Sequence, residues 1–362
     1  MKVRQITFPE REIWNNFVSQ TPECPILQSF EWGEFKAKFG WQPLRFAVED
    51  AGEIVGGIQI LKRPVPYIKH SILYAPRGPV INYKKLPDRE TVRRVIEFLL
   101  TEVEKEAEEH RAISLKIDPA VSEKQIEELD LLNTLGFEKA PKQIQPRATF
   151  IVNLRRSNDT ILASFEEKTR YNIRLAQRKG VVVQEDPSEK GLNVFYQLYQ
   201  ETANRDKFLI HPLRYYQLMR DILFTKGLGT NFIAYYEGKP IAAVIIFCFG
   251  QRVWYMYGAS SAEHRNVMPN HLLHWRVIEW AREKKYKKYD LWGIPANPKE
   301  GHPLWGVYRF KKGFNGKLVK YIGALNFPYS PLFYNIFEYG VEWWRSLRRL
   351  IKKGKIQDSL SE

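Results

Sequence analysis

Three arginines stand at a spacing that suits contact with a polyanion. Arg170, Arg174 and Arg178 lie four residues apart within 160–179, a stretch whose pattern predicts a helix. Residues four apart share one helix face, so their guanidinium groups should form one row of positive charge. Such a row fits the phosphate backbone of a nucleic acid. The alternative is a solvated helix face that has no partner.

Three histidines, His264, His271 and His274, carry side chains whose chemistry would suit a metal ion. No cysteine or carboxylate stands beside them at a spacing that completes a ligand set. A core or helix-capping role is therefore expected, and no metal. The sequence also lacks a G-x-S-x-G, a P-loop and a C-x-x-C motif. No cofactor is expected.

An aromatic run at 253–257 predicts a β-strand. Since side chains alternate along a strand, Tyr255 and Tyr257 should project to the same face. Gly258 should end this strand, and after a polar loop Asn270 should cap a helix. Sheet packing is the alternative role for both tyrosines.

The segment 305–316 places Arg309, Lys311 and Lys312 among Trp, Tyr and Phe residues. A lysine in such a setting can serve as a fixed cation. By itself the pattern favours the plainer interpretation, in which Lys311 is a solvated lysine on a strand.

The two halves of the chain look like copies of one unit. A hairpin, a long helix and a further strand occur twice in the same order, which favours duplication. The matching pairs are 48–61 with 234–247, RVIEF at 94–98 with RVIEW at 276–280, and LKID at 115–118 with DLWG at 290–293. The predicted fold class is α+β, with two domains that each contain a mixed sheet flanked by helices.

The repeat resembles the acyl-CoA N-acetyltransferase (GNAT) fold. The resemblance implies two tandem GNAT-like domains, 1–147 (completed by 325–362) and 148–324. In GNAT proteins a glycine-rich loop before the long helix holds the pyrophosphate of CoA on its backbone N–H groups. Met268 and Asn270 stand where those glycines would be, and the proline between them lacks an N–H. CoA is therefore disfavoured as a donor.

The composition is that of a folded chain with a strong positive charge. Its 362 residues suffice for two domains. A net charge of +15 favours a polyanionic partner such as nucleic acid, a phosphorylated metabolite or an acidic membrane surface. A basic protein without such a partner is the alternative.

Two cysteines make no disulfide framework. The start has no apolar signal region, and the apolar run 241–249 is too short to span a bilayer. A cytoplasmic location is expected.

The whole chain resembles the FemABX family from about residue 5 to residue 325. The motifs that carry the resemblance are QSFEWGEFKAKFGW, YAPRGPV, KTRYNIRLAQRKGV, YMYGAS and YRFKKGFNG. FemABX proteins are tandem-GNAT transferases that add amino acids from aminoacyl-tRNA to a peptidoglycan precursor. The resemblance implies that an amine of the stem peptide attacks the ester carbonyl of a charged tRNA. The coiled-coil arm of some members has no counterpart here, so a compact form is implied, and a monomer is expected.

Aminoacyl esters are already activated, so positioning and a fixed cation at the carbonyl oxygen can suffice for aminolysis. Through the resemblance Lys311 is that cation, Phe310 packs beneath it, and Asp118 is a candidate general base. The alternative for Asp118 is a strand-end residue in a turn. The resemblance also implies precursor-binding residues, with Lys36 at the diphosphate and His211 in a position where the family has arginine: Lys36, Arg205, His211, Arg214, Tyr215, Tyr255 and Tyr257.

Two other functions compete with this one. The first is an N-acyltransferase that uses acyl-CoA or a carrier-protein thioester, and the second is a non-catalytic module that binds tRNA or a membrane. Lys311 and the two strand tyrosines favour catalysis. The transferred amino acid and the accepting stem-peptide residue stay open, as does the choice between a soluble and a lipid-linked acceptor.

Residues 331–355 predict a basic amphipathic C-terminal helix. Apolar residues recur at helical spacing, and Arg and Lys residues crowd its second half. This pattern is typical of a helix on an anionic membrane surface, with Trp343 and Trp344 at the level of the headgroups. The alternative, docking on the first domain, is favoured for 331–342. Membrane contact is favoured for 343–355 and would bring the enzyme to a lipid-linked precursor.

Overall fold

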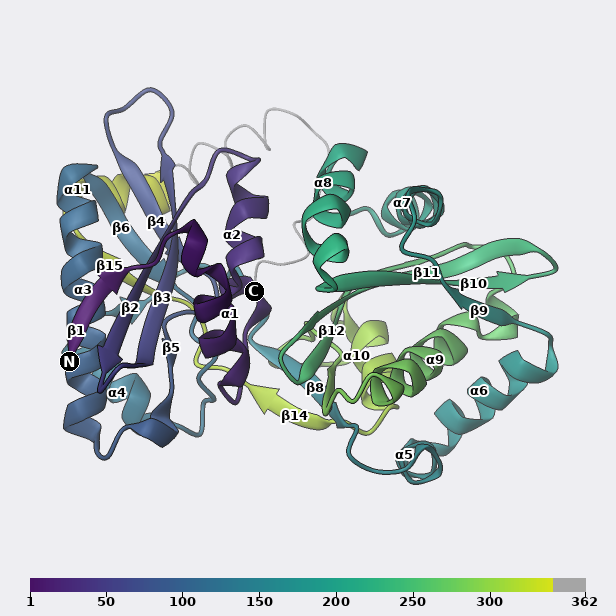
Figure 1. Ribbon diagram of the computed structural model, residues 1–362. Helices are drawn as coiled ribbons and strands as arrows, with labels where there is room; N and C mark the ends of the chain where they lie inside the picture. Colours follow the sequence, from purple (N-terminus) through teal and green to yellow (C-terminus); the bar gives the residue numbers. More distant parts are fainter. Residues whose placement is uncertain (341–362) are drawn as a thin grey trace. The chain divides into compact units, whose positions relative to one another are not determined.

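The computed structural model describes residues 1–340, which form two compact units (Figure 1). Unit 1 comprises Met1–Gln145 and the described chain from Tyr321 onward, and unit 2 comprises Pro146–Lys320. Each unit contains one mixed β-sheet flanked by helices. The predicted α+β class with two sheets is therefore confirmed.

The sheet of unit 1 has the strand order β1-β2-β3-β4-β6-β15-β7, and β5 pairs with β3. Neighbouring strands are antiparallel except β4 and β6, which are parallel. The strands are β1 (Lys2–Gln5), β2 (Gln42–Asp50), β3 (Glu53–Pro64), β4 (Ser71–Ala75), β5 (Val80–Ile81), β6 (Ala112–Ile117), β7 (Glu138–Lys139) and β15 (Leu325–Pro328). The α-helices are α1 (Arg11–Gln20), α2 (Phe30–Ala37), α3 (Arg89–Glu109), α4 (Ile126–Thr134) and α11 (Pro331–Asn335).

Helices cover both faces of this sheet (Figure 1). The apolar stripe of α3, which includes Val95 and Leu99, is buried in the main core of the unit. Two adjacent glycines on β3 let helices approach from opposite sides, because successive strand residues face opposite ways. A Cβ at Gly56 would meet Val95 of α3, and a Cβ at Gly57 would meet Trp14 of α1.

The sheet of unit 2 has the order β14-β8-β13-β12-β11-β10-β9. Helices α6 and α9 cover one face, and α7 and α8 lie on the other (Figure 1). The strands are β8 (Ala148–Asn153), β9 (Val182–Glu185), β10 (Gly229–Tyr236), β11 (Lys239–Phe249), β12 (Arg252–Ser260), β13 (Lys288–Asp290) and β14 (Lys317–Lys320). The α-helices are α5 (Asn158–Ser164), α6 (Glu167–Arg178), α7 (Glu189–Asp206), α8 (Leu213–Leu223), α9 (Pro269–Glu283) and α10 (Trp305–Lys312).

The duplication predicted from the sequence matches the topology of both units. Hairpin β2–β3 corresponds to β10–β11, and both hairpins have a register shift at matched positions, Val48/Glu49 and Ala234/Tyr235. In each unit a long helix, α3 or α9, connects the next strand to a parallel neighbour, β4 to β6 or β12 to β13. A β-bulge at the same position of both hairpins is expected if the two units arose by duplication, since bulges are retained within families.

The helix predicted over 160–179 is wrong in one respect, because the structure has two helices there. Helix α5 is capped by the hydroxyl of Ser157 and ends at Ser164, and the backbone of the next residue, Phe165, is extended. The Phe165 ring is buried and makes edge contacts with Trp275 and Phe314. Burial of this aromatic ring in the core outweighs the helical pattern of the flanking residues.

The first part of the predicted C-terminal helix packs within unit 1. The ring of Phe333 lies 4.1 Å from that of His70, and Asn326 donates a hydrogen bond to the Tyr334 hydroxyl at 2.6 Å. Glu338 is buried and pairs with Lys116 at 2.9 Å. As far as Glu338, the chain is therefore docked on unit 1, as the alternative interpretation expected. The predicted membrane-facing part, 343–355, lies outside the described residues. Among the residues that the structure describes, no helix is long and apolar enough to cross a membrane.

Candidate active site

Lys311 lies in the last turn of α10 and is buried, with a relative exposure of 6%. The alternative interpretation, a solvated lysine on a strand, is thus wrong in both element and burial. The ammonium nitrogen, Nζ, donates to the carbonyl oxygen of Gly293 at 2.7 Å and lies 3.5 Å from that of Trp292. It also sits 5.1 Å from the ring centroid of Tyr255. Two carbonyls and an aromatic face thereby hold the cation in one place.

Burial lowers the pKa of Lys311 from 10.5 to about 7, and the carboxylate of Asp290 opposes this effect. His274, on α9, is fully buried beside this lysine and shares its Nδ1 in a 2.7 Å hydrogen bond with the Tyr289 hydroxyl. Burial first, and Lys311 second, lower the pKa of His274 to about 3. His274 is therefore neutral at physiological pH, so Lys311 supplies the titratable positive charge here.

Tyr255 and Tyr257 project to opposite faces of the sheet, so the prediction of a shared face is wrong. The register of β11 and β12 shifts at this point: Ile245 pairs with Tyr257, and the next residue, Ile246, pairs with Tyr255. The bulge leaves one extra residue on β12 and reverses the alternation of side chains beyond it. Tyr255 contacts His274 on the α9 face, whereas Tyr257 contacts helices α7 and α8.

The sequence predicts that Gly258 ends the strand, and this prediction is wrong, because β12 continues to Ser260. A Cβ at position 258 would lie 1.8 Å from the Tyr255 hydroxyl and 2.7 Å from its Cζ. The glycine therefore makes room for the Tyr255 ring rather than for a turn. Asn270 does not cap α9 either: Pro269 is the first helical residue, which suits its missing N–H.

The face of the sheet opposite Lys311 holds a cluster of phenol side chains. Tyr257 makes edge contacts with Tyr199 of α7 and Tyr216 of α8. Burial raises the pKa of Tyr215 to about 12, and Tyr215 and Tyr257 are joined by a side-chain hydrogen bond. The imidazole of His211 stacks on Tyr215 with ring centroids 3.9 Å apart. Tyr215, Tyr257 and His211 thus come together, apart from Tyr255 and Lys311.

The remaining predicted residues of unit 2 have different surroundings. Arg205 donates to the carbonyl of Ser260 at 2.8 Å and pairs with Asp206 at 2.9 Å, so its guanidinium is engaged within the unit. Arg214 is exposed on the first turn of α8. Phe310 packs against the histidines of α9, His271 and His274.

Lys36 and Asp118 belong to unit 1. Burial, followed by the nearby Arg63, lowers the pKa of Lys36 to about 8. The Lys36 ammonium lies 5.6 Å from the ring centroid of Trp32. Because two cations are held close together, this place suits an anionic group such as a phosphate.

Asp118 is buried just after β6 and accepts a hydrogen bond from the Tyr74 hydroxyl at 2.7 Å. Burial raises the pKa of Asp118, and the Tyr74 hydroxyl, Arg77 and the backbone N–H of Gln145 act against that effect. A raised pKa suits a proton acceptor. The hydrogen bonds also fix the carboxylate within the unit, and a base role for Asp118 stays a prediction.

The arginines of α6 do not form a uniform row. Arg174 and Arg178 are exposed, and the Arg178 guanidinium lies 5.9 Å from the ring centroid of Tyr171. Arg170 is half-buried and donates to the carbonyls of Ala163 and Phe165 at the end of α5. Two of the three arginines are thus presented to solvent, and the third ties α5 to α6.

The loop before α9 differs from the glycine-rich loop that holds a pyrophosphate in GNAT proteins. The N–H groups of Val267, Met268 and His271 donate to carbonyls of the loop itself, and Pro269 has no N–H. Met268 adopts a left-handed backbone (φ 54°), and its side chain packs on the core of unit 2. Three N–H groups of this loop are thus occupied and a fourth is missing, which disfavours the backbone contacts by which GNAT proteins hold CoA.

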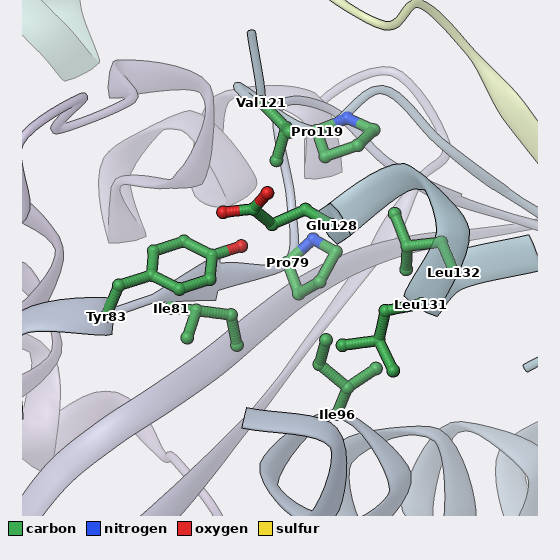
Figure 2. Close-up of a pocket in the computed structure, with 9 residues that line it drawn as sticks. All are labelled: Pro79, Ile81, Tyr83, Ile96, Pro119, Val121, Glu128, Leu131 and Leu132. Atoms are coloured by element: carbon green, nitrogen blue, oxygen red, sulfur yellow. The ribbon is translucent and has the colours of Figure 1, made fainter. Parts of the chain in front are cut away.

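A small pocket in unit 1 is apolar except for the Tyr83 hydroxyl and the Glu128 carboxylate (Figure 2). No candidate residue lines it, although Pro119 directly follows Asp118. Among the described residues no group of His, Cys, Asp or Glu could hold a metal ion. Within the described residues, the candidate features for chemistry are the buried lysine of unit 2 and the charged residues of unit 1.

The sequence interpretation missed two residues of the Lys311 surroundings, Asp290 and His274. His274 was expected in the core but not beside a buried cation. Asp290 was noted only as part of the DLWG repeat. Its signal was a lone carboxylate at the carboxyl end of a short strand, where functional side chains often gather.

A family model described as the FemAB family matches residues 10–227 and 225–340. The Lipid II:glycine glycyltransferase of Staphylococcus saprophyticus is 29% identical to this chain over 392 residues, which cover 89% of this chain and 92% of that protein. The crystal structure of FemX superposes with a TM-score of 0.85 at 25% identity, covering 93% of this chain and 100% of that chain. A tandem GNAT protein from the clavulanic acid biosynthesis pathway covers 91% of this chain and 99% of its own at 12% identity, with a TM-score of 0.53, and shares the fold alone.

These matches extend along nearly the whole described chain and include both copies of the repeat. They agree with the motifs that carry the sequence resemblance. Since the family model matches far more than half of the chain and relatives named as glycyltransferases align over 89% of it, this acyltransferase belongs to the FemAB family.

Proposed function

We propose that this enzyme transfers an amino acid from an aminoacyl-tRNA to an amine of a peptidoglycan precursor, and so builds an interpeptide bridge. The observation that carries the proposal is the buried ammonium of Lys311, held by the carbonyls of Trp292 and Gly293. A preorganised cation of this kind is what a developing oxyanion requires. The names of the similar glycyltransferases support lipid II as the acceptor and glycine as the first amino acid to test.

The reaction is an aminolysis of an ester. The amine nitrogen of the acceptor attacks the carbonyl carbon of the aminoacyl ester, and negative charge develops on the carbonyl oxygen. The C–N bond then forms, the bond from carbon to the ribose oxygen breaks, and the proton lost by the amine ends on that oxygen. An ammonium has three N–H donors. At most two of those on Lys311 are used by protein carbonyls, so the third can serve the oxyanion.

The charged residues of unit 1 supply the proposed precursor contacts. Lys36 and Arg63 offer paired cations for the diphosphate of the precursor. For the donor, Arg174 and Arg178 present exposed guanidinium groups to the tRNA backbone. Contact with an anionic membrane through the basic residues after 342 rests on the sequence pattern. Co-sedimentation of vesicles with the full chain and with a chain truncated after Tyr339 tests that contact.

One assay tests the function directly. The purified protein is incubated with lipid II and a mixture of charged tRNAs, and the masses of the products are measured. A mass increase of one or more amino acid residues is expected, with binding of tRNA that weakens steeply as salt rises. A parallel reaction with acetyl-CoA should give no product, because three N–H groups of the loop before α9 are bonded within the loop and Pro269 has none. Acetylated precursor in that reaction would favour the N-acyltransferase alternative.

A further inference from the structure

Asp290 is a carboxylate whose negative charge acts on the Lys311 ammonium and whose backbone leads into the turn that holds it. It is buried, with a relative exposure of 1%, at the end of β13. Its Oδ1 accepts hydrogen bonds from the Thr149 hydroxyl and, at 2.9 Å, from the backbone N–H of Trp292. Its Oδ2 pairs with the buried guanidinium of Arg252 at 3.4 Å. A buried carboxylate with this many partners is held in a single orientation.

The turn that follows Asp290 carries the carbonyls that hold Lys311. Trp292 adopts a left-handed backbone (φ 57°), which is uncommon for a bulky residue and needs local support. The hydrogen bond from its N–H to Asp290 gives that support, as aspartates do when they bond the backbone two residues on. In this conformation the carbonyls of Trp292 and Gly293 meet the Lys311 ammonium.

We propose that Asp290 is a positioning residue for transfer: it fixes the turn whose carbonyls orient the Lys311 ammonium, and its negative charge stabilises that ammonium. The inference deepens the proposed function and rests on it for its effect on catalysis. Asp290 does not touch the reacting atoms in this scheme. It acts through Lys311, and its partners Arg252 and Thr149 hold it in place.

The other groups around Lys311 do not titrate near neutral pH. Burial lowers the pKa of His274 to about 3 and that of His271 to about 4, so both imidazoles are neutral. Burial raises the pKa of the Tyr255 phenol well above the neutral range, so this ring is neutral as well. Arg252 stays charged and is paired with Asp290. A titration near pH 7 in this cluster therefore belongs to Lys311, with Asp290 as the charge that raises its pKa.

The first experiment measures the pKa of Lys311 without substrates. The protein is labelled with ¹³C at the lysine Cε, and the Lys311 resonance is identified by its loss in Lys311→Met. Asp290→Asn keeps an oxygen that can accept from Trp292 but removes the charge, so the pKa of Lys311 should fall by roughly one unit or more. Thr149→Val keeps the charge and removes one hydrogen bond to it, so the pKa of Lys311 should change by less than in Asp290→Asn.

Arg252→Gln gives the opposite sign, because it leaves the carboxylate and removes the other cation beside it. The pKa of Lys311 should then rise, and this variant carries the test alone if Asp290→Asn does not fold. Shifts of equal direction in Asp290→Asn and Arg252→Gln would reflect a general disturbance and would overturn the inference. An unchanged pKa of Lys311 in Asp290→Asn would overturn it too.

The second experiment measures transfer in a double-mutant cycle. In the parent, Asp290→Asn should move the alkaline limb of the pH–rate profile toward acid by the same amount as the pKa. In the Lys311→Met background, Asp290→Asn should cause no further loss, because the group through which it acts is absent. A purely structural residue would reduce transfer in both backgrounds. If Lys311→Met itself leaves transfer unchanged, the proposed function of the lysine fails, while the resonance measurement still decides the coupling of Asp290 to Lys311.

Discussion

Replacing Lys311 with methionine should abolish most transfer while leaving the fold intact. Methionine keeps the length and apolar character of the lysine stem but removes the ammonium that donates to the carbonyls of Trp292 and Gly293. Loss of one preorganised donor to an oxyanion reduces turnover by about 10²–10³, or roughly 3–4 kcal/mol. We expect a loss of at least about a hundredfold in turnover.

The expected stability of Lys311→Met follows from two opposing effects. Lowering the pKa of a buried lysine from 10.5 to about 7 means that its charged form is disfavoured by roughly 5 kcal/mol in the folded state. The substitution removes this penalty but leaves two carbonyls without their donor, at about 1–3 kcal/mol each. The two effects nearly cancel at or below pH 7. Between pH 7 and pH 10.5 the folded lysine has already lost its proton while the unfolded chain still holds one. The cost of removing that proton shrinks as the pH rises, so the parent gains stability relative to the variant.

Single-turnover transfer from a charged tRNA measures the first effect, and thermal unfolding at pH 7 and pH 9.5 measures the second. Lys312→Met is a matched control, since Lys312 is exposed on the same helix turn. It should transfer at nearly the parent rate. Transfer by Lys311→Met at the parent rate, with the protein folded, would refute the role of the cation.

Three further predictions concern other parts of unit 2. Gly258→Ala should destabilise the protein by about 1–3 kcal/mol in chemical denaturation, because the new Cβ would meet the Tyr255 hydroxyl. This loss of stability should shrink in a Tyr255→Phe background, and an equal loss there would contradict the proposed clash. In the parent, protonation of His274 opposes folding between pH 6.5 and pH 3, because its folded-state pKa is lowered to about 3. His274→Gln should therefore lose less stability on acidification across this range, and acid-unfolding curves that coincide with the parent's would contradict this. Arg174→Ala with Arg178→Ala should weaken tRNA binding and lower the slope of affinity against salt by up to about 2, as filter binding at several salt concentrations would show; an unchanged slope would remove α6 from the tRNA site.

Much of the architecture followed from local patterns in the sequence. The apolar periodicities of the two hairpins and of helices α3 and α9 recur in the same order, so the duplicated fold could be inferred from the sequence. Met268 and Asn270, which stand where GNAT proteins have glycines, also disfavoured CoA as the donor. These features depend on residues close in sequence, whose periodicity and turn chemistry act locally.

The environment of the candidate lysine could be found only in the tertiary structure. One extra residue in the pairing of β11 with β12 turns Tyr255 toward Lys311 and Tyr257 away from it, and strand periodicity alone cannot show where such a bulge occurs. The burial that lowers the pKa of Lys311, and the carboxylate of Asp290 that opposes it, come from different elements of unit 2. The sequence by itself determined which residues could carry charge, whereas long-range packing decided which of them are buried together, because desolvation and Coulomb interactions depend on distance in space and not on separation along the chain.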